Sequence, residues 1–149
     1  AAAAPVLFVY EEENPETKPY IELFRNELRA SGVDFDELSA AGAVQNGAGV
    51  PADCELVIVY AAVMRFGSPT PAGDWLKAQK DFRGKIVRIR VPANRWFLEA
   101  VRKRLEKTAK AARPEEVDAL SQATKDFTDA DKQLLVSGWV RSALAGYGK

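Results

Sequence analysis

The chain has no histidine and a single cysteine among its 149 residues. Histidine is the commonest general base and the commonest metal-binding side chain, so its absence argues against Ser–His or Cys–His hydrolases and zinc enzymes. One cysteine, Cys54, excludes a disulfide within the chain and any site built from several thiolates. Because Cys54 precedes an apolar segment, we expect a buried thiol rather than a reactive one. The sequence therefore predicts no metal site and favours a protein that is not an enzyme.

Long apolar runs are also missing. No stretch approaches the roughly 20 apolar residues that cross a bilayer. Because the sequence opens with Ala1 to Ala4 and Pro5, we expect no intact signal peptide. We expect no membrane insertion and a cytoplasmic protein or, if these alanines remain from a cleaved targeting peptide, one from the interior of an organelle. A length of 149 residues, 47% of them hydrophobic and 28% charged, suits one domain over residues 1–149.

Positive and negative charges cancel over the whole chain but are segregated along it. Residues 1–60 carry 11 acidic and 3 basic side chains, a balance of −8, whereas residues 61–113 carry 4 acidic and 14 basic, a balance of +10. Residues 114–149 have a balance of −2. Such asymmetry is typical either of a molecule with an acidic and a basic side or of charged faces that are simply solvated. The net charge of the whole chain is zero, which argues against nucleic acid as the partner.

Apolar periodicity predicts alternating strands and helices. The predicted strands are residues 6–10, 33–38, 56–61 and 85–91. The predicted helices are residues 18–30, 71–81, 95–112 and a last helix that runs from Thr128 to about Gly146. Expected N-caps are Thr17, Asn94 and Thr128, and Gly32 supplies a left-handed residue after the first helix. Residues 113–126 fit either a short helix or a poor fifth strand, and they open a C-terminal segment, 113–149, that we expect to be helical.

The strand compositions predict the order of the sheet. Segments 6–10 and 56–61 are apolar throughout, which is typical of central parallel strands covered on both faces. Segment 33–38 alternates with acidic residues, and segment 85–91 places Arg88 and Arg90 on one face, so we expect both at or near the edges, the arginine face partly in water. Right-handed crossovers then give an α/β fold, a three-layer doubly wound parallel sheet of order 2-1-3-4 with an uncertain fifth strand.

Residues 56–91 resemble the middle of a flavodoxin-like domain. In that family an apolar strand is followed by an aromatic-Gly-Ser loop, a Pro-Ala pair, an aromatic-Leu pair on a helix, and Gly-Lys before the next strand. The corresponding residues here are Phe66-Gly67-Ser68, Pro71-Ala72, Trp75-Leu76 and Gly84-Lys85. The resemblance implies a flavodoxin-like fold. It also implies, for a typical member, FMN at the carboxyl ends of the strands with its phosphate in a Ser/Thr-Gly loop after the first strand.

The loop after the first strand departs from this family pattern. It reads Glu11-Glu12-Glu13-Asn14-Pro15-Glu16-Thr17, which is acidic and contains no glycine. A phosphate beside these carboxylates meets a repulsion of roughly 1 kcal/mol or more per close pair at near-surface dielectric. We therefore expect that the chain has lost FMN and holds no cofactor. If FMN binds, the resemblance implies contacts from Thr17, Phe66, Gly67, Asn94 and Trp96.

The combined pattern predicts a non-catalytic flavodoxin-like accessory subunit that works through protein–protein contact. Segregated charge and a basic middle third favour docking on a protein with an acidic surface. The residues expected to make this contact are Arg88, Arg90, Arg95, Arg102, Lys103 and Lys107. The alternative is an FMN-binding electron-transfer flavoprotein with an atypical phosphate site.

Overall fold

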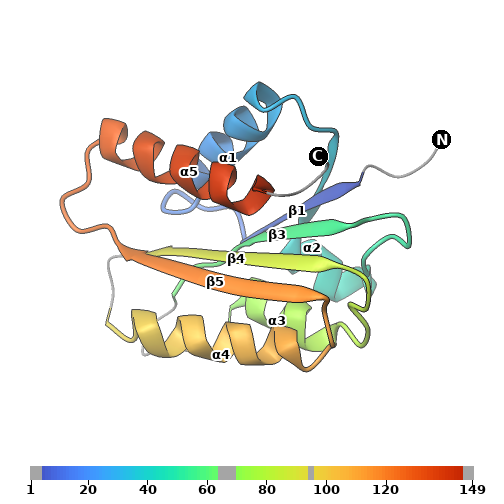
Figure 1. Ribbon diagram of the computed structural model, residues 1–149. Helices are drawn as coiled ribbons and strands as arrows, with labels where there is room; N and C mark the ends of the chain where they lie inside the picture. The colour runs from blue at the N-terminus through green and yellow to red at the C-terminus, as the bar shows by residue number, and fades with distance from the viewer. Residues whose placement is uncertain (1–4, 64–69, 94–95, 146–149) are drawn as a thin grey trace.

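The computed structural model describes residues 5–63, 70–93 and 96–145, in which strands and helices alternate (Figure 1). The strands are β1 (Val6–Tyr10), β2 (Phe35–Ser39), β3 (Leu56–Tyr60), β4 (Ile86–Ala93) and β5 (Glu116–Ala123). The helices are α1 (Lys18–Ala30), α2 (Ala40–Asn46), α3 (Pro71–Ala78), α4 (Leu98–Lys110) and α5 (Asp129–Leu144). All strand pairs are parallel, in the order β2-β1-β3-β4-β5. The predicted α/β class and strand order are confirmed, and the uncertain segment supplies a fifth strand.

Helices cover both faces of the sheet, which gives the three predicted layers. Helices α1 and α5 lie on one face, and α2, α3 and α4 lie on the other (Figure 1). Successive residues of a strand point to opposite faces, so Phe8 and Ile58 pack under α1 and α5, whereas Val9 and Val59 pack under the other layer. This double burial explains why β1 and β3 are apolar at every position.

The arginine face of β4 is not partly in water, as the sequence predicts, but buried. Strand β5 pairs with the edge of β4 that was expected to be exposed. Arg88 and Arg90 are therefore only 6% and 0% exposed. Asp118 on β5 accepts hydrogen bonds from both guanidinium groups, at 3.0 and 2.5 Å. Glu116, two residues earlier, contacts Arg88 at 2.9 Å. Burial is tolerated because these carboxylates supply the counter-charge. The expected helical segment is thus corrected: over its described residues, 113–145, it is the strand β5 followed by the helix α5.

The start of α4 also differs from the prediction. The helix begins at Leu98, after Phe97, whose φ of 71° places it in the left-handed region. Trp96 and Phe97 therefore precede the helix instead of joining its apolar face, and they are 86% and 49% exposed. The predicted cap, Asn94, lies outside the described residues.

Helix α5 begins as predicted. The Thr128 hydroxyl accepts a hydrogen bond from the Asp131 backbone N–H at 3.1 Å, and the Asp131 carboxylate accepts one from the Thr128 N–H at 3.0 Å. This reciprocal capping box fixes the N-terminus of α5 beside the end of β5. Across residues 5–63, 70–93 and 96–145, no helix is both long enough and apolar enough to span a bilayer.

Candidate functional site

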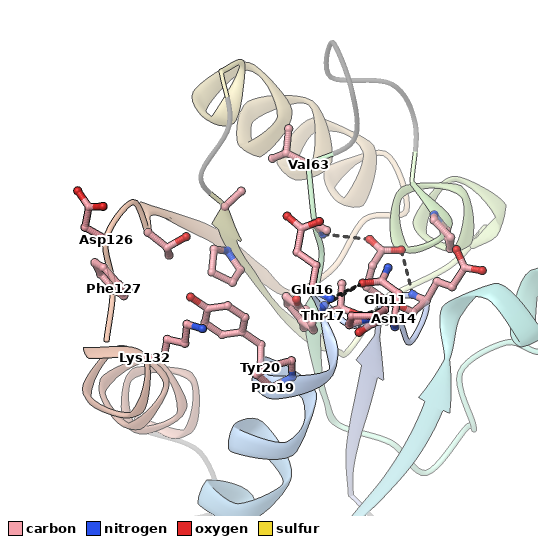
Figure 2. Close-up of a pocket in the computed structure, with 18 residues that line it drawn as sticks. Glu11, Asn14, Glu16, Thr17, Pro19, Tyr20, Val63, Asp126, Phe127 and Lys132 are labelled. Carbon is pink, nitrogen blue, oxygen red and sulfur yellow. Dashed lines mark hydrogen bonds between the residues drawn. The ribbon is translucent and has the colours of Figure 1, made fainter. Parts of the chain in front are cut away.

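A cavity of about 550 Å³ lies at the carboxyl ends of the central strands (Figure 2). Its walls come from the β1–α1 loop, the residues that follow β3, the end of β4 and the β5–α5 connection. The chain leaves β1 toward β2 on one side, while β3 lies on the other, so the cavity sits at the topological switch point of the sheet. Ligands of doubly wound folds bind at such points. The fold therefore places this cavity where a small molecule is expected.

Glu11 directly follows β1 and holds two neighbouring segments against the end of this strand. Glu11 is 2% exposed. Its carboxylate accepts hydrogen bonds from the backbone N–H groups of Ala62 at 3.0 Å and Ala72 at 3.2 Å. Ala62 follows β3, and Ala72 lies in the first turn of α3, where unpaired N–H groups favour an anion. Burial raises the pKa of Glu11, although these hydrogen bonds oppose the shift. The first of the three glutamates is therefore a structural anchor, buried in the wall of the cavity.

The rest of the β1–α1 loop satisfies its own backbone. The Asn14 side-chain oxygen accepts hydrogen bonds from the N–H groups of Glu16 at 2.9 Å and Thr17 at 3.0 Å. The Thr17 hydroxyl accepts from the Asn14 N–H at 3.0 Å and donates to the Glu12 carbonyl oxygen at 2.6 Å. The N–H groups of Asn14, Glu16 and Thr17 are thus already used within the loop. Glu12 and Glu16 line this side of the cavity.

The opposite wall has a different chemistry. Tyr20 from the first turn of α1 and Lys132 from the first turn of α5 converge there, with the Lys132 ammonium 5.8 Å from the centroid of the Tyr20 ring (Figure 2). Thr124 and Phe127 of the β5–α5 connection complete it. Burial raises the pKa of Tyr20, so its hydroxyl stays protonated at neutral pH. The cavity thus has an acidic side and a side rich in hydrogen-bond donors.

Of the five residues predicted to contact FMN, one lines the cavity, one does not, and three lie outside the described residues. Thr17 lines the cavity, while Trp96 is exposed and does not line it. Phe66, Gly67 and Asn94 lie outside the described residues. Tyr20, Thr124 and Lys132 were missed, although their positions at two helix N-termini and after a strand are the available sequence signal.

The predicted docking residues are likewise divided. Arg88 and Arg90 are buried in ion pairs with β5, so they are unavailable to a partner and that part of the prediction is corrected. Arg102 is ion-paired with Glu99 and Glu106 on its own helix. Arg95 lies outside the described residues. Lys103 and Lys107 are exposed on α4.

Metal binding finds no support in the described ranges, where no group of three or more Asp, Glu, Cys or His side chains is arranged to hold an ion.

No protein-family model and no curated protein matches the chain. Solved structures do match it. Oxidised Flavodoxin 2 from Bacillus cereus aligns with a TM-score of 0.64 at 18% identity, covering 93% of this chain and 99% of that one. General stress protein 14 from Treponema denticola, solved in complex with FMN, aligns at 0.65 and 12% identity, covering 93% and 97%. An NADH:FMN oxidoreductase in its apo form aligns at 0.65 and 12% identity, covering 97% and 92%. The chain therefore has the flavodoxin-like fold.

These neighbours contradict the sequence-based expectation of a chain without a cofactor. Among the proteins that share its fold, some are named as flavodoxins, one was solved in complex with FMN and one is an NADH:FMN oxidoreductase, and they point to FMN. The repulsion of FMN expected from the sequence requires three glutamates at the mouth of the sheet. In the structure the Glu11 carboxylate is buried and accepts backbone hydrogen bonds, although Glu11, Glu12, Glu16 and Asp126 all line the cavity.

Proposed function

We propose that this chain is a flavodoxin-like electron-transfer protein that binds FMN in the cavity with an atypical phosphate site. The observation that carries the proposal is the cavity at the switch point of a 2-1-3-4-5 sheet, where flavodoxin-like folds hold FMN. The resemblance to solved flavodoxins and FMN oxidoreductases supports it. When bound, FMN supplies one-electron and hydride transfer, while the protein binds and orients it.

The residues present fit such a group. A volume of about 550 Å³ lies within the range of small-molecule sites, roughly 300–1,000 Å³. Tyr20, Phe127, Pro92 and Val63 offer apolar and aromatic surface for a planar ring system. Lys132 offers a positive charge for an anionic group. The β1–α1 loop fits the phosphate poorly because its donors are used internally, which is why we describe the phosphate site as atypical.

Titration of FMN into the purified protein tests the proposal. We expect quenching of the flavin fluorescence and a shift of its visible bands, with a dissociation constant well below ~100 μM. Ala93→Trp should abolish binding because Ala93 lines the cavity at the end of β4. Ala123→Trp is the matched control, since Ala123 is its neighbour on β5 but is exposed and outside the cavity. Flat titrations of the wild type with FMN would contradict the proposal.

We further propose that the protein partner is acidic and docks on a groove between α3 and α4. This groove, of about 600 Å³, has an apolar floor that includes Val101 and Leu105. Its rim carries four cations and one carboxylate. The cations are Lys77, Lys80, Arg104 and Lys107. Within the described ranges the three lysines form no ion pair, so their charge is available to a negatively charged surface.

A fluorescent peptide of glutamates serves as the probe for this groove. Reversing Lys77, Lys80 and Lys107 to Glu should weaken binding by at least ~10-fold at low salt, and added salt should weaken wild-type binding. A control variant reverses three cations outside the groove: Lys18, Arg29 and Lys125. Its net charge changes equally, so equal losses in both variants would contradict the proposed groove.

A further inference from the structure

The hydroxyl group of Tyr20 is buried without a hydrogen-bond partner. Tyr20 is 6% exposed, and its Oη makes no hydrogen bond in the part of the chain that the structure describes. Burial raises the pKa of Tyr20 and the nearby Thr124 side chain opposes that shift, but the two hydroxyl groups do not reach hydrogen-bond geometry. Buried polar groups in native proteins are almost always paired. Because Tyr20 lines the cavity, a bound ligand can supply the hydrogen-bond partner that its hydroxyl group lacks.

Lys132 supplies charge at the same point. Its ammonium lies over the Tyr20 ring and forms no ion pair among residues 5–63, 70–93 and 96–145. Figure 2 shows the Tyr20 hydroxyl and the Lys132 ammonium close to one another, facing the same part of the cavity. Asp126 also lines the cavity, but its carboxylate points away from both groups in this view. A hydroxyl donor and an ammonium together suit an oxyanion with several acceptor oxygens.

The other side of the cavity offers the reverse chemistry. There Glu12 and Glu16 line the wall, and the N–H groups of Asn14, Glu16 and Thr17 are already bonded within the loop. An anionic group that enters this cavity is repelled from that side and attracted to the Tyr20 side. The cavity is thus polarised between the carboxylates of the β1–α1 loop and the Lys132 ammonium of α5.

We infer that Tyr20, Thr124 and Lys132 form a subsite for a phosphate monoester. The Lys132 ammonium and the Tyr20 hydroxyl donate to the phosphate oxygens, and the Thr124 hydroxyl adds a third donor. This inference rests on the proposed function, in which the monoester is the phosphate of FMN. It moves that phosphate from the β1–α1 loop to the space between α1 and α5.

Comparing FMN with riboflavin isolates the phosphate, because the two ligands differ by that group alone. We expect the wild type to bind FMN at least ~10-fold more tightly than riboflavin, as one charge-assisted hydrogen bond provides. Lys132→Met should remove most of this ratio, and Tyr20→Phe should reduce it several-fold, while riboflavin affinity changes little. Lys125→Met is the control, since Lys125 lies on the same connection but outside the cavity.

Two results would overturn the subsite. One is an FMN-to-riboflavin ratio that survives both Lys132→Met and Tyr20→Phe in variants that unfold like the wild type. The other is a ratio that rises several-fold in Glu12→Gln but is insensitive to Lys132→Met, which would put the phosphate at the β1–α1 loop.

If neither flavin binds, the proposed function fails and inorganic phosphate becomes the probe. Phosphate protection of the wild type but not of Lys132→Met in thermal unfolding would keep the subsite, and no protection would overturn it as well.

Discussion

Replacing Asp118 by alanine tests the ionic contact that joins β4 to β5. The two carboxylate oxygens of Asp118 lie 2.5 Å from Arg90 Nη1 and 3.0 Å from Arg88 Nη1. Arg90 is fully buried, and burial lowers its pKa, an effect that the Asp118 carboxylate opposes. Asp118→Ala leaves the Arg90 guanidinium inside the protein without its counter-charge. We therefore expect a clear loss of stability.

The structure sets the size of this loss. Removing one partner of a fully buried ion pair costs about 3–5 kcal/mol. The cost here is smaller, because the Asp118 side chain is 41% exposed and Arg90 keeps hydrogen bonds to the Ile89 carbonyl oxygen and the Ser142 hydroxyl. We expect the free energy of unfolding to fall by about 2–3 kcal/mol. For a chain of this length, that corresponds to about 4–12 °C in melting temperature.

Urea unfolding followed by circular dichroism measures the change. Glu116→Ala is the matched control, since Glu116 is 58% exposed and Arg88 keeps Asp118; a loss below about 1 kcal/mol is expected. The double variant Arg90→Met/Asp118→Ala removes both charges and should recover most of the stability. A loss smaller than about 0.5 kcal/mol in Asp118→Ala would refute the view that this carboxylate compensates the buried guanidinium.

Three further predictions concern the cavity and its frame. Glu11→Ala should lower the free energy of unfolding by about 2–3 kcal/mol, because backbone N–H groups after β3 and in α3 lose their acceptor. Since burial raises the pKa of Glu11 above 4.5, its contribution is complete below that pH and is lost as pH rises through the folded pKa. Melts across pH should therefore show a larger difference from the wild type in acid than at neutral pH. Thr128→Ala should cost about 1 kcal/mol by breaking the capping box, and Thr128→Ser should restore it in urea titrations. Tyr20→Phe should leave the unfolding free energy unchanged or raise it by up to about 1 kcal/mol, because no hydrogen bond is lost; a decrease would show that the hydroxyl is paired.

Most of the fold could be predicted because its signals are local. Strands β1 and β3 are apolar at every position, since both of their faces are covered. Gly32 follows the end of α1 in a left-handed backbone conformation, and Thr128 begins α5 through its hydroxyl cap. Strand β5 could not be predicted in the same way. Its sequence is half polar, and what makes it a strand is the match of Asp118 to two arginines on β4. These residues are about 30 positions apart in the sequence, so their pairing can be recognised only once β4 and β5 are placed side by side.

The candidate site was predictable in position but not in composition. The fold alone places a ligand at the carboxyl ends of the central strands, and Thr17 lines the cavity as expected. Reading Glu11 as a surface charge was wrong, because its role depends on N–H groups of Ala62 and Ala72 that arrive from other elements. Tyr20 and Lys132 come from opposite ends of the chain, and their meeting depends on the packing of α1 against α5.

The left-handed turn at Phe97 gives the protein a built-in optical reporter. Of its three tryptophans, Trp75 is fully enclosed and Trp139 is 7% exposed, whereas Trp96 is 86% exposed just ahead of that turn. A water-soluble quencher such as iodide reaches Trp96 and spares the two shielded indoles. The red-shifted part of the tryptophan emission therefore reports the binding of a ligand or partner next to Trp96, between β4 and α4, without an added label.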